Sequence, residues 1–352
     1  MDFGFTAEQA DLRDTVRAFL TRYATSERVR AADGFDAELW RRLAGELGVT
    51  ALAIDEEHGG FGASEVELGV VLEEAGRVLL PTPYLSTVTA SAAVDPALAA
   101  DLLPGLADGS VIATLALAEP GGDWISGRWS CTARRVGDGY LVDGIKEHVL
   151  DGAVADVVVV VAVCDGEPGL FAVRAGDLRC TPHDTLDLTR RQARLEFAAA
   201  PATLVGRDVW RALDLLWSGL AVESVGVARA SLDLTIDYLR TRRQFGVPLA
   251  HFQALRHRVA DLAVAVESAI SSAWYALRVA GTDEFTVAAP VAKLVATRAA
   301  YQVTAESIQL HGGIGFTWEH DAHLYFKRAT ANRLLLGDEV ALRRVIAARA
   351  GL

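Results

Sequence analysis

The chain has 352 residues, of which 51% are hydrophobic, and its formal net charge is −12. This length and composition predict a globular protein of two or three domains and argue against a disordered one. An acidic chain without a basic stripe is a poor candidate for nucleic-acid binding, because phosphate contacts need clustered Lys and Arg.

Three cysteines, Cys131, Cys164 and Cys180, show no CxxC spacing, so we expect neither a disulfide framework nor a metal site. The first residues lack the basic and apolar regions of a signal peptide. The purest apolar run, residues 157–163, is far shorter than the roughly 20 residues that a membrane-spanning helix needs. We therefore expect a cytoplasmic protein without membrane insertion.

Residues 1–108 read as a helical domain. Thr6 can cap the first helix, with Gln9 three residues later as the partner in a capping box. Leu12, Val16 and Phe19 then form an apolar helix face with Leu20.

Residues 109–206 contain β-branched runs separated by turn residues, which predicts a β domain. The turn Gly137-Asp138-Gly139 separates two strand-like runs, residues 129–136 and 140–149, and predicts a hairpin. Further runs at residues 157–164 and 193–198 extend a sheet that we expect to be mostly antiparallel.

Residues 207–352 read as helices again. Apolar side chains recur at alternating spacings of three and four, beginning with Leu213, Leu216 and Leu220, which predicts a four-helix bundle with large interfaces. The expected fold class is α+β: an N-terminal all-α domain, a middle antiparallel β domain and a C-terminal four-helix bundle.

One motif runs from Tyr238 to Gly246. Alone, it predicts a helix that ends at Gly246 with Arg242 near its end. A guanidinium there can bind a diphosphate through two parallel bonds, Phe245 offers an aromatic face to an adenine, and Gln253 offers an amide. An ordinary helix end, with basic residues matching the helix dipole, explains the same residues.

A second motif is Gln309-Leu-His-Gly312-Gly313. Paired glycines allow a ligand to approach the backbone closely, although they also occur where a helix simply stops. A third, weaker motif is Ala118-Glu119-Pro120-Gly121-Gly122, at the end of a strand.

Together these motifs closely resemble the acyl-CoA dehydrogenase family, and the resemblance covers nearly the whole chain. The residues that carry it are the spacing Tyr238-x-x-x-Arg242-x-x-Phe245-Gly246, then Gln253, Ala260-Asp261 and Gln309-x-x-Gly312-Gly313-x-Gly315-Phe316, with Glu56 to Gly62, Ala118 to Gly121, Asp143-Gly144-x-Lys146 and Leu188-Thr189-Arg190.

The resemblance implies an FAD-dependent enzyme built into dimers and tetramers, with the flavin between the β domain and the bundle of one subunit. A neighbouring subunit holds the diphosphate and adenine. By resemblance, that neighbour's grip consists of Arg242, Gln244, Phe245, Gln253, Gln309, Gly312 and Gly313. The implied reaction removes an α-proton from an acyl-CoA and transfers a β-hydride to the flavin, with a carboxylate as base and an electron-transfer flavoprotein as acceptor.

The chain departs from the family at the two familiar positions of the base, which hold Leu216 and Gly337. Neither residue can accept a proton. At the places that surround the flavin ring, the chain has Ala118, His148 and Leu150, of which only His148 could stack on the ring or donate to it. The segment from Gly121 to Trp124 also replaces the usual phosphate-facing loop, which puts an ordinary CoA grip in doubt.

The residues that would hold a neighbour's flavin are intact, whereas the chain's own ring pocket lacks most of its hydrogen-bonding side chains. This indicates a half-site partner, which completes the flavin site of a base-bearing subunit and resembles the shorter subunit of heteromeric actinobacterial-type acyl-CoA dehydrogenases. An autonomous homo-oligomer with a relocated base is the main alternative. Its candidate bases are Asp338, one place past Gly337, and Glu223, which shares a helix face with Leu216. Glu223 could equally be a structural carboxylate paired with Arg or Lys. A non-catalytic scaffold subunit and a flavin monooxygenase on the same fold also remain open.

Overall fold

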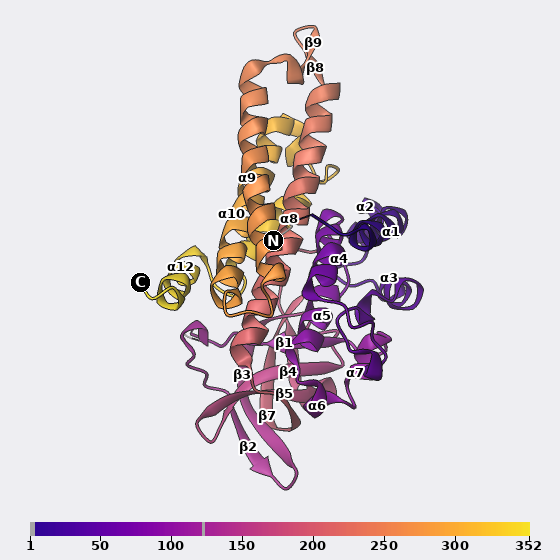
Figure 1. Cartoon of the computed structure of the whole chain (residues 1–352). Coiled ribbons are helices and arrows are strands. Elements are labelled where there is room, and N and C mark those ends of the chain that lie inside the picture. The colour runs from indigo at the N-terminus through magenta and orange to yellow at the C-terminus, as the bar shows by residue number, and fades with distance from the viewer. Residues whose placement is uncertain (1–3, 122–123) are drawn as a thin grey trace.

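The computed structural model describes residues 4–121 and 124–352, and its elements follow one another in three regions (Figure 1). The helices of the first region are α1 (Ala7–Tyr23), α2 (Ser26–Ala31), α3 (Ala37–Arg42), α4 (Glu65–Arg77), α5 (Tyr84–Ala93), α6 (Pro96–Ala99) and α7 (Leu103–Ala107). The strands of the second are β1 (Ala113–Ala116), β2 (Thr132–Val136), β3 (Gly139–Leu150), β4 (Val157–Cys164), β5 (Glu167–Arg174), β6 (Arg179–Pro182) and β7 (Gln192–Gly206).

The third region is helical and contains a small hairpin. Its elements are α8 (Val209–Thr241), β8 (Arg243–Gln244), β9 (Val247–Pro248), α9 (Gln253–Arg278), α10 (Phe285–His311), the 3-10 helix η7 (Gly312–Phe316), α11 (Ala322–Leu334) and α12 (Glu339–Arg349). The predicted α+β class, with a β domain between two helical regions, is confirmed.

The start of α1 follows the sequence prediction. The hydroxyl of Thr6 accepts a hydrogen bond from the Gln9 backbone N–H (3.2 Å), and the Thr6 N–H donates to the Gln9 side chain (3.1 Å). This capping box satisfies two of the backbone donors that a helix start leaves free. Val16, Phe19 and Leu20 are then buried, as the spacing predicts.

The β domain closes on itself. Its strands pair in the order β1-β4-β2-β3-β7-β5, and β5 also pairs with β4, so the ladder returns to its own second strand. The predicted hairpin is present as β2 and β3. The sheet is mixed rather than purely antiparallel, because β1 lies parallel to β4 along four residue pairs.

The valine-rich strand β4 is shared by two cores. Val158 and Val160 belong to the core inside the closed sheet, whereas Val159 and Val161 belong to the large core formed with the helices. Successive side chains of a strand point to opposite faces, so a strand buried on both faces needs a continuous apolar run. This explains the run of residues 157–163.

The helical regions meet where α4 crosses α8. A Cβ added at Gly226 would lie 2.0 Å from the backbone oxygen of Glu73, and one added at Gly76 would lie 2.1 Å from that of Glu223. The two helix backbones therefore approach so closely that only glycine fits at either position.

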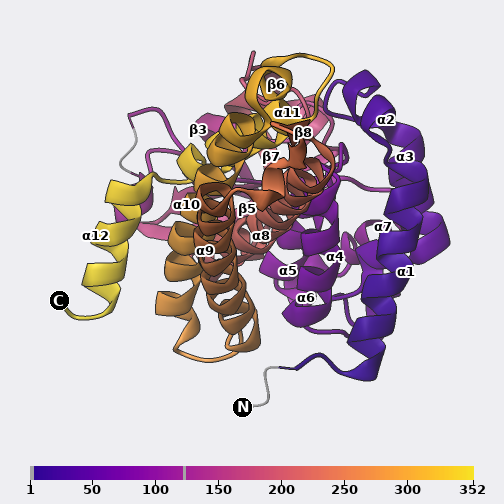
Figure 2. The same ribbon diagram turned by 90° about the horizontal axis from the view of Figure 1, so that it is seen from above.

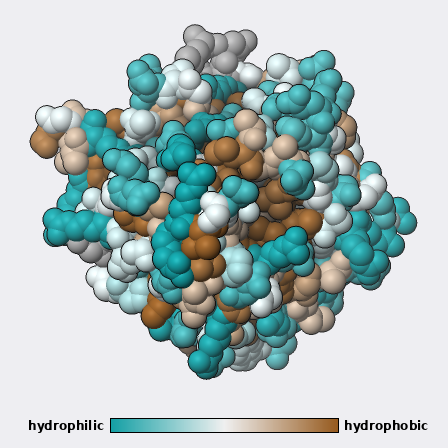
Figure 3. All heavy atoms as spheres, turned by 90° about the horizontal axis from the view of Figure 1, so that it is seen from below, coloured by the Kyte–Doolittle hydropathy of each residue, from teal (hydrophilic) through white to brown (hydrophobic). Residues whose placement is uncertain are grey.

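The bundle lies between α12 on one side and the N-terminal helices α1 to α3 on the other, as the view from above shows (Figure 2). From below, the molecule presents a surface on which hydrophobic atoms gather near the middle among hydrophilic ones (Figure 3). Within the described ranges, no helix is long and apolar enough to cross a membrane.

Candidate functional site

A cavity of about 840 Å³ opens between the β domain and the last helices. Pockets of this size are typical of small-molecule sites. The lining residues come from the chain after β1, from β3, from the loop before β7 and from the α11–α12 connection: Ala118, Glu119, Pro120, Gly121, Ile125, Glu147, His148, His183, Asp184, Thr185, Leu186, Gln192, Thr330, Ala331, Leu334, Leu335, Leu336, Gly337, Asp338 and Ala341.

The two familiar base positions lie in different surroundings. Leu216 is buried in the core formed with the helices and is not among the described residues that line the cavity. Gly337 does line the cavity, but its φ is +103°, and a Cβ there would lie 2.5 Å from Cδ1 of Ile125. The backbone conformation therefore strains any side chain at Gly337, and the end of the Ile125 side chain would have to move to make room for one.

The loop that contains Gly337 is held from beneath by two buried donors. The indole N–H of Trp217 donates to the Leu336 carbonyl (2.8 Å), and Nζ of Lys293 donates to the Gly337 carbonyl (2.5 Å). Burial lowers the pKa of Lys293 to about 7, and the Asp338 charge acts in the opposite direction. These contacts keep this wall of the cavity in a fixed shape.

Asp338, one of the two predicted candidate bases, lies on the cavity lining and is exposed. Its carboxylate accepts a hydrogen bond from the Ala341 N–H (2.9 Å) and so caps the N-terminus of α12. This contact gives Asp338 a structural role and leaves one carboxylate oxygen without that constraint.

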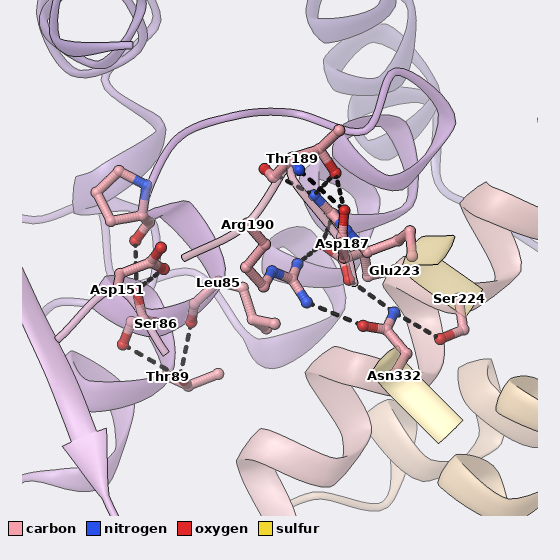
Figure 4. A network of polar contacts seen from close by, with 12 residues as sticks. Leu85, Ser86, Thr89, Asp151, Asp187, Thr189, Arg190, Glu223, Ser224 and Asn332 are labelled. Carbon is pink, nitrogen blue, oxygen red and sulfur yellow. Dashed lines mark hydrogen bonds and ion pairs between the residues drawn. The ribbon is translucent and has the colours of Figure 1, made fainter. Parts of the chain in front are cut away.

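Glu223, the other candidate, lies in a buried polar network (Figure 4). Its Oε1 accepts hydrogen bonds from Arg190 and from Arg328 (3.2 Å), and its Oε2 accepts one from the Asn332 amide (3.0 Å). Glu223 is not among the described cavity-lining residues. The geometry favours the structural interpretation of Glu223, because both carboxylate oxygens are occupied by hydrogen bonds from buried side chains.

The same network ties the loop before β7 to α11. Arg328 is fully buried and also donates to the Asp187 carboxylate (2.5 Å) and the Thr189 carbonyl (3.0 Å). The motif Leu188-Thr189-Arg190 thus lies against the α11 segment, although nothing in the spacing of the two segments predicts the contact.

A second buried pair joins two motifs that the sequence shows separately. Nζ of Lys146 lies 2.6 Å from Oε1 of Glu119, and Oε2 of Glu119 accepts hydrogen bonds from the backbone and hydroxyl of Ser130. Burial acts to raise the pKa of the Glu119 carboxyl, but the Lys146 charge and the Ser130 donors outweigh it and lower that pKa. The pair fixes the strand end at the cavity mouth.

The three positions that the sequence analysis assigned to the flavin-ring pocket lie in different surroundings. Ala118 and His148 line the cavity, whereas Leu150 is buried in the core. His148 has a positive φ of 53°, and its Nδ1 lies 3.2 Å from the Gln192 side-chain oxygen. Of the replaced phosphate-facing loop, Gly122 and Asp123 lie outside the described residues.

Two further cavity residues were missed by the sequence interpretation. The ring of His183 lies 5.1 Å from that of His148, and its Nε2 lies 3.1 Å from Oε2 of Glu147. Neither His183 nor Glu147 belongs to a recognisable motif, so only the folding of β3 against the loop before β7 reveals the cluster.

The first grip motif has a different local structure from the predicted one. Helix α8 ends at Thr241 rather than at Gly246, and Arg242 is its C-cap. The next residues form the hairpin β8–β9, with Phe245 (φ +52°) and Gly246 (φ +82°) at its tip. Two successive positive φ values suit a tight hairpin turn, which the helix-end interpretation overlooked.

The grip residues gather at the end of the bundle remote from the β domain. Figure 1 shows the β8–β9 hairpin at that end, and α9 begins there with Gln253. Helix α10 follows α9 in the chain and runs antiparallel to it, with Gln309 near its last residue. Gly312 and Gly313 follow in η7. The residues of this set are all exposed: Arg242, Gln244, Phe245, Gln253, Gln309, Gly312 and Gly313.

The surroundings of this set suit a dinucleotide. The Phe245 side chain is 92% exposed, and a Cβ added at Gly312 or at Gly313 would meet no described heavy atom within 4 Å. Guanidinium, amide and aromatic groups thus lie near open backbone, where an adenine and a diphosphate can approach. Across the described residues, no group of three or more metal-binding side chains is present.

Comparison with known proteins gives the family. The models described as "Acyl-CoA dehydrogenase, N-terminal domain" and "Acyl-CoA dehydrogenase, C-terminal domain" match residues 6–110 and 211–351. Acyl-CoA dehydrogenase IpdE2 of Mycolicibacterium smegmatis is 37% identical over 94% of this chain and 94% of its own length. The mitochondrial short-chain specific acyl-CoA dehydrogenase of Mus musculus is 30% identical over 86% of this chain and 80% of its own.

Solved structures agree. The "Tcur3481-Tcur3483 steroid ACAD G363A variant" superimposes with a TM-score of 0.92 at 34% identity, covering 98% of both chains. The ChsE4-ChsE5 complex from Mycobacterium tuberculosis gives a TM-score of 0.91 at 29% identity, covering 100% of this chain and 99% of the other. This chain therefore belongs to the acyl-CoA dehydrogenase family of FAD-dependent oxidoreductases.

Proposed function

We propose that this chain is a half-site partner in a hetero-oligomeric acyl-CoA dehydrogenase, where it completes the flavin site of a base-bearing relative. One observation carries the proposal. The grip residues are exposed at the end of the bundle remote from the β domain, whereas the chain's own cavity has glycine at the base position that lines it.

The grip fits the diphosphate and adenine of FAD held by a neighbouring subunit. Arg242 would pair with the diphosphate, Phe245 would stack on the adenine, and Gln253 would hydrogen-bond to polar groups of the dinucleotide. The flavin, when bound, supplies the hydride-accepting chemistry of the dehydrogenation. Around the chain's own ring position, Ala118 and Leu150 offer no side-chain hydrogen bonds, which fits the ring poorly.

Two solved relatives support a partner of the same family. Each is named for two proteins, Tcur3481 with Tcur3483 and ChsE4 with ChsE5, and the first is described as a steroid ACAD. By analogy we propose an acyl-CoA whose acyl group is a steroid or a related polycycle as the substrate, and an electron-transfer flavoprotein as the acceptor. The domain boundaries that we propose, after residues 108 and 206, fall just before β1 and α8.

The test is flavin content. The protein purified alone should be colourless, and co-expression with a base-bearing relative should give a yellow complex with about one flavin per pair of subunits. In that complex, Arg242→Ala should lower flavin occupancy, whereas Arg41→Ala, an exposed arginine on α3, should leave it unchanged. Flavin near one per subunit in the lone protein, together with turnover, would disprove the proposal.

That result would instead favour the autonomous enzyme. Asp338 would then be the residue to replace first, because it lines the cavity and Glu223 does not. A complex that binds flavin but loses no activity when Arg242 is removed would point to a scaffold role.

A further inference from the structure

The last residue of α10, His311, connects two parts of the grip. Its ring stacks on the ring of Tyr238 near the end of α8, with centroids 4.5 Å apart and an interplanar angle of 33°. The Tyr238 carbonyl accepts a hydrogen bond from the Arg242 N–H (2.8 Å), and Gly312 directly follows His311 in the chain. The stack therefore sets the paired glycines of η7 against the segment that carries Arg242.

A second histidine ring also contacts His311. His320 lies in the loop before α11, and its ring centroid is 4.4 Å from that of His311. Its Nδ1 accepts a hydrogen bond from the Ala322 N–H (3.2 Å) at the start of α11. The ends of α8 and α10 and the start of α11 thus meet at one buried ring, because His311 is only 2% exposed.

The contacts of His311 suit the neutral form of the ring. Nδ1 lies 2.7 Å from the Ser307 carbonyl oxygen, which can only accept, so in the neutral imidazole the proton sits on Nδ1. Nε2 is buried and makes no hydrogen bond with any described group. A second proton would have to sit on this nitrogen, where no described carboxylate pairs with it.

The groups around the ring also disfavour a charge on it. Burial lowers the pKa of His311 and the neighbouring His320 acts in the same direction, whereas the carbonyls of Ser307 and Leu234 oppose them. The charged or titratable groups that act on His320 are Asp321, His323 and Arg30. Because the buried ring has the lower pKa, a proton binds an open stack more readily than a closed one, so acid favours the open stack.

We infer that His311 is a positioning residue of the grip, which holds Gly312 and Gly313 in place for the dinucleotide only while its ring is uncharged. This inference rests on the proposed function and gives that site a pH dependence. The complex should release flavin as the pH falls below about 6.5, where a free imidazole begins to charge. His257 is a further titratable group of this region, since its Nε2 lies 3.3 Å from the Gln253 amide nitrogen.

The experiment measures the dissociation constant of FAD from the complex with a base-bearing relative, followed by flavin fluorescence at pH 7.5 and pH 5.5. In the wild type this constant should be about tenfold higher at the lower pH, because uptake of one proton over one pH unit changes a coupled equilibrium by up to about tenfold. His58→Gln, a histidine outside the grip, should keep this profile.

Two replacements of His311 separate its ring from its charge. His311→Phe keeps a ring in the stack but cannot take a proton, so its dissociation constant should stay within about threefold of the wild-type value at pH 7.5 and change by less than about threefold at pH 5.5. His311→Ala removes the ring and should weaken FAD binding by about tenfold at pH 7.5.

A His311→Phe profile equal to that of the wild type would overturn the inference, because His257 and His320 remain in that variant. Equal wild-type affinity at both pH values would overturn it too, as would a folded His311→Ala variant that holds FAD as tightly as the wild type. If His311→Ala does not fold, the comparison with His311→Phe still decides. A wild-type pair without flavin at pH 7.5 would refute the proposed function itself, whereas failure of these comparisons in a flavin-bearing pair refutes only the role of His311.

Discussion

Replacing Glu223 by Gln decides whether this carboxylate is structural or catalytic. In the folded chain its side chain is 4% exposed and neutralises part of the charge of Arg190 and Arg328, with Asp187 as the other buried carboxylate on Arg328. The variant would retain two guanidinium groups with Asp187 as the one carboxylate still in direct contact with Arg328. Breaking a buried ion pair in this way costs about 3–5 kcal/mol, since it leaves an uncompensated charge.

The expected loss is a large part of the total stability of a folded protein, which is of the order of 5–15 kcal/mol. For a chain of this size it corresponds to a fall in the unfolding midpoint of roughly 4–7 °C. Circular dichroism during heating measures that midpoint. Glu57→Gln is the matched control, because its carboxylate is 76% exposed, and the change there should stay within about 0.5 kcal/mol.

The reasoning fails if Glu223→Gln unfolds within about 0.5 kcal/mol of the wild type. If that stable variant also abolished turnover in the complex with a base-bearing relative, the carboxylate would be a base, contrary to its contacts. A destabilised variant whose complex still binds flavin and turns over would establish the structural role.

Further tests follow from the packing of α4 on α8 and from the loop beneath the cavity. Gly226→Ala should destabilise the fold by about 1–3 kcal/mol in urea unfolding, whereas Gly281→Ala, with no atom within 4 Å of the added Cβ, should have little effect. Because burial lowers the pKa of Lys293 to about 7, the unfolded chain binds more protons above that pH, so wild-type stability should rise from pH 7 towards the alkaline range. The variant Lys293→Met should lack this rise, and parallel pH series of the melting midpoint would show it. Gly337→Glu should not create turnover in the lone chain, since its φ of +103° resists a side chain, and any dehydrogenation by that variant would contradict the geometry.

The hydrophobic periodicity of the sequence predicted those parts of the fold that depend on residues close together in the chain. The capping box at Thr6, the hairpin of β2 and β3 and the helical bundle all depend on residues that are close in sequence, and all are present. The parallel pairing of β1 with β4 depends on a contact across about forty residues, and no local pattern encodes it. The hairpin after α8 was hidden because a tip residue with positive φ, Phe245, is a phenylalanine rather than the usual Asn or Gly.

The candidate site also has features that the sequence predicts and features that only the folded chain reveals. The grip motif was visible because its residues have family-like spacing. The identity of Leu216 and Gly337 excluded a base at the familiar positions without any coordinates. The partners of Glu223 were not visible, since Arg190 and Arg328 reach it from segments 33 and 105 residues away. In a sequence, a lone carboxylate on an apolar helix face can be interpreted as a catalytic base or as half of a buried ion pair. Only the contacts of the folded chain distinguish the two interpretations.

In the proposed function, the grip and the chain's own ring position lie at opposite ends of one chain. At the far end of the bundle, open glycine backbone and an exposed phenylalanine lie remote from the chain's own β domain. Beside the β domain, the loop with glycine at the family's base position is held by Trp217 and Lys293. A chain with only the grip is useful to a neighbour that supplies the rest of the site. A pair of related subunits could therefore lose one base and one ring pocket without losing activity, as long as the grip at Arg242 was kept.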